Sequence, residues 1–123
     1  MSEYINNKKI QESILLTIRK MLGYHYDHFD TDLIVHINTY LGVLCQLGIG
    51  PKTSFTIEDE KATWADFLNE ESDLEGVKSY LYYRVKLAFD PPANSSVQES
   101  MKKMADELEW RLNVTVDPRL NES

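Results

Sequence analysis

The sequence contains a single cysteine, Cys45, so it has no internal disulfide framework. Cys45 lies in the apolar helical pattern "TYLGVLCQLG", where we expect it to act as a small buried hydrophobic side chain. No apolar run approaches the roughly 20 residues that are needed to cross a bilayer. The first residues, "MSEYINNKKIQES", also lack the apolar stretch of a signal peptide. We therefore expect synthesis in the cytoplasm and no membrane partner.

An excess of basic residues is also absent. The chain has 13 Lys and Arg against 20 Asp and Glu, which gives a formal net charge of -7. Both halves are acidic, with five basic and eight acidic residues up to position 60 and eight and twelve after it. Nucleic-acid binding normally requires a basic surface. An acidic surface would instead let DNA pass without specific binding, because it repels phosphate.

The sequence has no catalytic signature. It contains no nucleophile elbow, phosphate loop or dinucleotide-binding fingerprint. The carboxylates at 58–60 and 70–73 are runs in predicted surface connections, where solvated side chains are expected. One connection carries a cluster of histidines and aspartates, namely His25, Asp27, His28 and Asp30. Their spacing matches no established zinc motif, so we expect no enzyme, catalytic residue, metal site or cofactor.

Hydrophobic periodicity predicts five helical segments in one domain. The first helix carries Ile10, Ile14 and Ile18 and ends at Gly23, and the second is capped by Asp30 or Thr31 and ends before Gly48. The short third helix is capped by Thr63. The fourth runs from Ser72 or Asp73 through Phe89, and the fifth follows Ser96. The fifth helix places five apolar residues on one face: Val97, Met101, Met104, Leu108 and Leu112.

Two further segments alternate with a period of two. Phe55 and Ile57 predict a short strand or extended arm near residues 51–60. Val114 and Val116 alternate with polar residues until Pro118, which predicts an extended C-terminal tail over 113–123 after a helical domain over 1–112. The expected fold class is therefore mostly all-α, a small bundle of about four to five helices with a short extended or β arm and an extended tail.

The predicted fourth helix is apolar on nearly every side. Its tyrosines, Tyr80, Tyr82 and Tyr83, surround Arg84. A helix of this kind is usually covered on more than one face, and a second subunit is a natural source of one cover. The same tyrosines could form a base-stacking platform, but no basic groove accompanies them. We favour helix packing and subunit contact, with Phe55, Ile57 and these four residues as candidates.

The fourth helix stops abruptly at Asp90-Pro91-Pro92. Neither proline can donate a backbone hydrogen bond, and each restricts the residue before it to extended geometry. Ser96 and Glu99 then have the spacing of a capping box, which would start the fifth helix a few residues later. We interpret this segment as a rigid corner that holds the fifth helix and the tail at a fixed angle.

Several segments in order resemble one family: "YLGVLCQLGIGP", "FTIEDEKATWADFL", "VKSYLYYRVKLAFDPPANSSVQESM" and "ELEWRLNVTVDP". Over about residues 15–118 the chain resembles the head–tail connector, or adaptor, proteins of long-tailed bacteriophages. The resemblance implies a virion protein of the neck that forms a ring, typically twelve-fold, under the portal. Such a ring extends the DNA channel and is a platform for a stopper or tail-completion protein.

In similar adaptors the C-terminal segment grips the portal. Carried over to this chain, the resemblance implies a set of candidate docking residues: Val114, Val116, Asp117, Pro118, Arg119 and Leu120. Acidic candidates for the channel wall are Asp27, Asp30 and Asp32. Two alternatives remain open. One is a neck or tail-completion protein at another level of the assembly, and the other is a small helical DNA-binding regulator of a phage, which the net charge disfavours.

Overall fold

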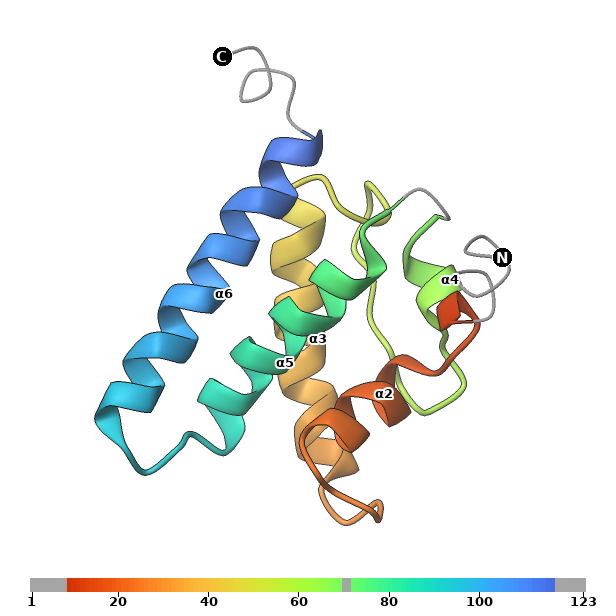
Figure 1. Cartoon of the computed structure of the whole chain (residues 1–123). Coiled ribbons are helices and arrows are strands. Elements are labelled where there is room, and N and C mark those ends of the chain that lie inside the picture. Colours follow the sequence, from red (N-terminus) through yellow and green to blue (C-terminus); the bar gives the residue numbers. More distant parts are fainter. Residues whose placement is uncertain (1–8, 70–71, 117–123) are drawn as a thin grey trace.

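The computed structural model describes residues 9–69 and 72–116 (Figure 1). These residues form five helices: α2 (Ile14–Met21), α3 (Asp30–Gln46), α4 (Trp64–Phe67), α5 (Leu74–Phe89) and α6 (Ser95–Val116). The described residues contain no strand, and their one isolated antiparallel bridge joins Ser13 to Thr63. The predicted all-α class is confirmed.

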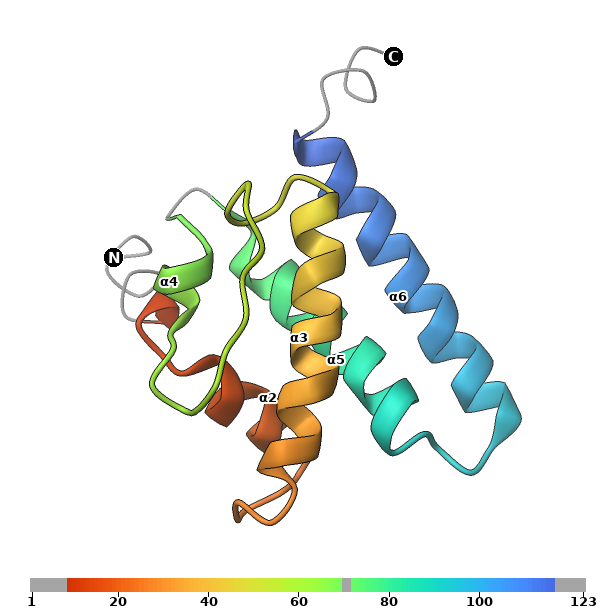
Figure 2. The same cartoon turned by 180° about the vertical axis from the view of Figure 1, so that it is seen from behind.

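Helix α5 lies between α3 and α6, and α2 packs against α3 and α5 (Figures 1 and 2). The core residues of α3 follow helical spacing and are fully buried: Leu33, Ile37, Leu41 and Leu44. They meet Val77, Leu81 and Val85 of α5 in one hydrophobic core. The second cover that we expected for the fourth helix therefore comes from α6 of the same chain.

Most of the predicted helix ends are confirmed. The Asp73 carboxylate accepts the Gly76 amide at 2.9 Å and caps α5, and Thr63 is the N-cap of α4. Gly23 and Gly48 follow α2 and α3 with positive φ, as the C-terminal position of a helix favours. The predicted cap of α3 is wrong, because α3 begins after Phe29 without a side-chain cap. Asp30 forms an ion pair with Arg19 instead, at 2.8 Å.

Two predictions about α6 are also wrong. Ser96 and Glu99 do not form its capping box, because the Asn94 side chain accepts the amides of Ser96 and Val97 at 2.8 and 3.2 Å. Asn94 reaches both amides because α6 starts at Ser95, two residues earlier than expected. The helix also continues through Val116, so residues 113–116 are helical rather than extended. Residues 117–123 lie outside the described part of the chain.

The segment over residues 51–60 is extended in part but is not a strand. The side chain of Asn38, on α3, holds it: Asn38 Oδ1 accepts the Ile57 amide at 2.7 Å, and Asn38 Nδ2 donates to the Ile57 carbonyl at 3.0 Å. One amide side chain thus satisfies both backbone groups, as a neighbouring strand would. Ile57 is buried in the core and Phe55 packs against it, so this arm lies against its own subunit.

Candidate assembly surfaces

The corner after α5 is tied to the connection between α2 and α3. Asp90 Oδ2 accepts hydrogen bonds from the Tyr24 hydroxyl at 2.9 Å and from Lys86 Nζ at 3.1 Å. The Phe89 ring packs against the rings of Tyr24, at 6.1 Å between centroids, and Phe29, at 5.4 Å. Because these contacts join the end of α5 to the connection between α2 and α3, the Asp90-Pro91-Pro92 corner is held by side-chain contacts as well as by its prolines.

These contacts shift the pKa values of both hydrogen-bonded partners. The pKa of the Asp90 carboxyl is lowered, first by the hydrogen bond from Lys86 and then by the one from Tyr24. The pKa of the Tyr24 hydroxyl is raised, first by burial and then by its hydrogen bond to Asp90. The corner is therefore stabilised by an ionised Asp90 and a neutral Tyr24.

This arrangement predicts a dependence of stability on acid pH. Because the pKa of Asp90 is lowered in the folded state, its contribution is complete above the unfolded-state value of about 3.9 and is lost as the pH falls through the lower folded-state value. We expect Asp90→Asn to have a lower melting temperature than the wild type at pH 7. The difference should shrink as the pH is lowered to about 3, in thermal scans followed by circular dichroism. A difference that is constant over this range would contradict the role of the charge.

A polar network joins α5 to α6. The Tyr80 hydroxyl donates to Glu109 Oε1 at 2.6 Å, and Arg84 forms ion pairs with Asp106 at 2.9 Å and Glu109 at 3.3 Å. The Arg84 guanidinium also lies 5.3 Å from the centre of the Tyr80 ring. The pKa of Tyr80 is raised, first by burial and then by the hydrogen bond to Glu109. These bonds orient α6 along α5, since α6 itself buries only Ala105 and Leu112.

The candidate subunit-contact residues divide into two groups. Ile57 and Tyr80 are buried within the subunit, and Phe55 packs against its core. Tyr82 and Tyr83 are partly exposed and lie 5.3 Å apart between ring centroids. Arg84 is mostly buried by α6. Phe55, Tyr82 and Tyr83 are therefore the candidates with partly exposed apolar rings, and their part in a subunit contact stays a prediction.

The face of α6 that was predicted to be apolar is only partly covered. Leu112 is buried, but Val97 and Met104 are 45% and 43% exposed. With Tyr83 and Met101 they line a shallow groove of about 310 Å³ along α5 and α6. Trp110 is 63% exposed on α6; it belongs to the segment "ELEWRLNVTVDP" that carries the resemblance, but it was not among the predicted contact residues. In the sequence, Trp110 is a large aromatic residue that falls outside the helical spacing of the apolar face, and this position is what indicates its exposure.

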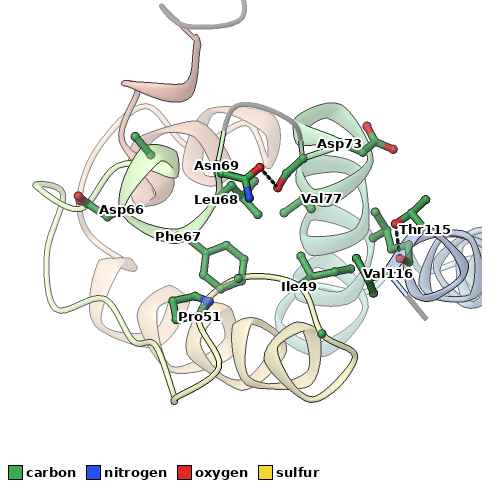
Figure 3. Close-up of a pocket in the computed structure, with 15 residues that line it drawn as sticks. Ile49, Pro51, Asp66, Phe67, Leu68, Asn69, Asp73, Val77, Thr115 and Val116 are labelled. Carbon is green, nitrogen blue, oxygen red and sulfur yellow. Dashed lines mark hydrogen bonds between the residues drawn. The ribbon is translucent and has the colours of Figure 1, made fainter. Parts of the chain in front are cut away.

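A larger cavity of about 370 Å³ lies where α4, the start of α5, the end of α6 and the segment after α3 meet (Figure 3). Its walls are apolar at Ile49, Phe67, Leu68 and Val77. Helix α6 contributes Leu112, Thr115 and Val116 from its last turns. This cavity was not predicted, because it depends on three regions that are distant in the sequence: residues 48–51, 65–77 and 112–116.

Of the candidate portal-docking residues, the structure describes two. Val114 and Val116 lie on the last turn of α6, where Val114 is partly buried and Val116 is 42% exposed. The Val116 side chain lies against Gly48, where an added Cβ would come within 3.2 Å of it. The other candidates, Asp117, Pro118, Arg119 and Leu120, lie outside the described residues.

The histidine- and aspartate-rich connection also has a defined arrangement. The His28 ring packs on Phe29 at 4.8 Å, and Asp30 is paired with Arg19. Asp27 and Asp32 are exposed, whereas Asp30 is not fully exposed. Within residues 9–69 and 72–116, no group of three or more His, Cys, Asp or Glu side chains is placed to hold a metal ion. No helix in the same ranges has the length and the hydropathy that a membrane span needs.

Comparison with known proteins gives one match. The family model described as phage connector protein matches residues 14–119, which is most of the chain and includes all five helices. No curated protein and no solved structure matches the chain.

Proposed function

The chain belongs to the phage connector protein family, a structural family of the bacteriophage head–tail junction, and from this premise we propose that it is the adaptor directly beneath the portal. In this role it forms a ring, typically twelve-fold, in the neck of the virion. The ring extends the DNA channel and presents a platform to a stopper or tail-completion protein. The family match over residues 14–119 carries the proposal.

The exposed side of α6 supports assembly. Val97 and Met104 are 45% and 43% exposed and lie two helical turns apart on one face of α6, whereas Trp110, which is 63% exposed, lies on another side of this helix. Val97 and Met104 line a groove with Tyr83 and Met101, and exposed apolar surface of this kind commonly marks a site of protein–protein contact. In a ring, Tyr82 and Tyr83 would lie beside the same surface, because the groove along α5 and α6 includes Tyr83.

The charge supports passage of DNA rather than its specific binding. The chain has a net charge of -7, and its acidic residues are spread over both halves. A channel lined by such subunits repels phosphate and so does not retain the duplex. Asp27 and Asp32 are exposed and remain candidates for the channel wall.

The C-terminal end of α6 is the proposed origin of the portal contact. Figure 1 shows α6 running from the proline corner at one end of the subunit to Val116 at the other. Since residues 113–116 belong to α6 and Thr115 and Val116 line a cavity of the subunit, the proposed docking segment is 117–123. Val114 and Val116 support it from the last helical turn.

The test is co-sedimentation of the purified protein with the portal of its own phage, followed by negative-stain imaging. We expect the full chain to bind and add a ring, and a chain that ends at Val116 to lose most of the binding while it stays folded. Binding by both forms would support the adaptor function and contradict the assignment of residues 117–123 to the portal contact. No binding by the full chain to an intact portal would favour the neck or tail-completion alternative, and salt-dependent binding to duplex DNA would favour the regulator.

The proline corner gives a second expected result. We expect the double variant Pro91→Ala, Pro92→Ala to bind the portal much more weakly, because the direction of α6 relative to the subunit body is less restricted. Its melting temperature should fall only slightly, since Asp90 still pairs with Tyr24 and Lys86. Equal loss of stability and of portal binding would mean that the prolines serve the fold alone.

A further inference from the structure

One edge of the arm over residues 51–60 is paired within the subunit. The arm follows α3, turns back and runs beside this helix (Figure 2). On the edge that faces α3, the amide and the carbonyl of Ile57 both bond to the Asn38 side chain, at 2.7 and 3.0 Å. In an extended chain the two backbone groups of one residue point to the same edge, and those of the next residue point to the opposite edge. The backbone groups of Thr56 and Glu58 therefore point away from α3.

The opposite edge of the arm has no partner in the part of the chain that the structure describes. The backbone groups of Ser54, Thr56 and Glu58 make no hydrogen bond there, and all three residues are exposed. Unpaired backbone groups along an extended segment are a template for another extended chain. Residues 54–58, which contain no bend, have the length of a typical strand. This edge therefore fits an added strand.

The arm is complementary to a second copy of itself. When the unbent segments of two chains pair along their whole length as antiparallel strands, Thr56 lies opposite Thr56 of the second copy and Ser54 lies opposite Glu58. The same register brings Lys52 of each copy opposite Glu60 of the other. Both of these side chains are exposed and form no ion pair with other described residues. Because opposite charges on facing strands stabilise their pairing, the charges favour a second copy as the added strand.

We propose that two copies of the free protein associate through this edge, with residues 54–58 paired as antiparallel strands about a twofold axis at Thr56. Phe55 and Ile57 stay packed on the core of their own subunit. The new contact consists of backbone hydrogen bonds and of the two ion pairs between Lys52 and Glu60. It goes beyond the proposed function, because a twofold contact joins the same surface of both copies, whereas neighbours in a ring meet through two different surfaces.

Disulfide trapping in the full-length protein tests the register. The background is Cys45→Ser, which leaves no other thiol. Thr56→Cys places a thiol at the axis, where facing Cα atoms lie about 5.5 Å apart, within the range that a disulfide spans. Thr53→Cys is the matched control, since Thr53 is exposed on the same arm but lies about 20 Å from Thr53 of the second copy in this register.

We expect Thr56→Cys to form a disulfide-linked dimer at least about tenfold faster than Thr53→Cys, because contact raises the effective concentration of the two thiols. Equal rates for the two variants would overturn the proposal, since they would reflect random collision. A Thr56→Cys protein that stays monomeric under oxidation would also overturn it.

Charge reversal tests the same contact without cysteines. Sedimentation equilibrium of the wild-type protein should show a dimer that dissociates on dilution. We expect Lys52→Glu to raise the dissociation constant by about fivefold, because both copies then place like charges opposite each other. The double variant Lys52→Glu, Glu60→Lys should restore the wild-type value, since the two charges only exchange places.

Three results of this experiment would overturn the proposal. They are a wild-type protein that stays monomeric up to about 1 mM, a dimer that Lys52→Glu leaves unchanged, and a double variant as weak as the single one. Neither experiment uses the portal. Failure of the adaptor function would therefore leave this contact standing, and failure of the contact would leave the adaptor function standing.

Discussion

Gly50→Ala is expected to lower the free energy of unfolding by about 3 kcal/mol. Gly50 has a φ of +88°, in a region that costs other residues about 1–2 kcal/mol. A Cβ at this position would also lie 2.7 Å from Cζ of the Phe67 ring. Phe67 is buried in the core and cannot move away freely, so the ring and the segment after α3 would both have to shift.

Two other glycines are matched controls for this change. Gly23 has a similar φ of +90° but no atom within 4 Å of an added Cβ, so Gly23→Ala should show the backbone strain alone. Gly42 lies within α3 with no such neighbour, so Gly42→Ala should raise stability by up to about 1 kcal/mol. Chemical denaturation of the three variants measures both effects. A loss for Gly50→Ala no larger than that for Gly23→Ala would show that the contact with Phe67 is unimportant.

The second large effect is expected at Asn38. Asn38→Leu removes the hydrogen bonds to the amide and the carbonyl of Ile57. Each buried backbone group that loses its partner costs about 1–3 kcal/mol, and we expect a total loss of about 3 kcal/mol. The arm over residues 51–60 should detach locally before the helices unfold, because its other anchor is the burial of Ile57 and Phe55.

Hydrogen exchange of the Ile57 amide, together with denaturant unfolding, measures this result. Exchange at Ile57 should become faster than at core amides of α3. Thr39→Ala is the matched control, since Thr39 is the next residue on α3, is exposed and bonds only to Val35 of the same helix. An Asn38→Leu variant as stable as Thr39→Ala would mean that water replaces the lost hydrogen bonds.

The helices could be predicted because each depends on a local pattern. Leu33, Ile37, Leu41 and Leu44 recur at helical spacing, and all four are buried in the structure. The end of α5 at Phe89 follows from the two prolines after it. The cap of α6 was missed because Asn94, Ser95 and Ser96 are all good N-cap residues, and the choice among them depends on where the backbone turns after Pro92.

The period-two segments show where local patterns fail. Val114 and Val116 alternate with polar residues, but they continue α6, which their neighbour Leu112 anchors in the core. β-branched residues lower helix propensity only slightly, so tertiary packing overrides the alternation. Ile57 alternates as a strand residue would, yet its backbone partner is the side chain of Asn38 rather than another strand.

The surfaces were the least predictable part. Tyr80 was expected at a subunit contact, but it is buried beneath α6 and hydrogen-bonded to Glu109. Trp110 was not among the predicted contact residues, although it is the most exposed of the large hydrophobic residues in the described chain. Exposure depends on which helix covers which face, and the pattern of one helix does not contain this information.

The sequence by itself determined the helical class, the positions of most helix ends, the acidity and the family, because these depend on local spacing, composition and the order of motifs. Only the tertiary structure decided that α6 covers α5, that Asn38 holds the arm, and that a cavity lies beside Val116. Each of these joins residues far apart in the chain. Their positions follow from the packing of whole helices around one core, and no local pattern encodes that packing.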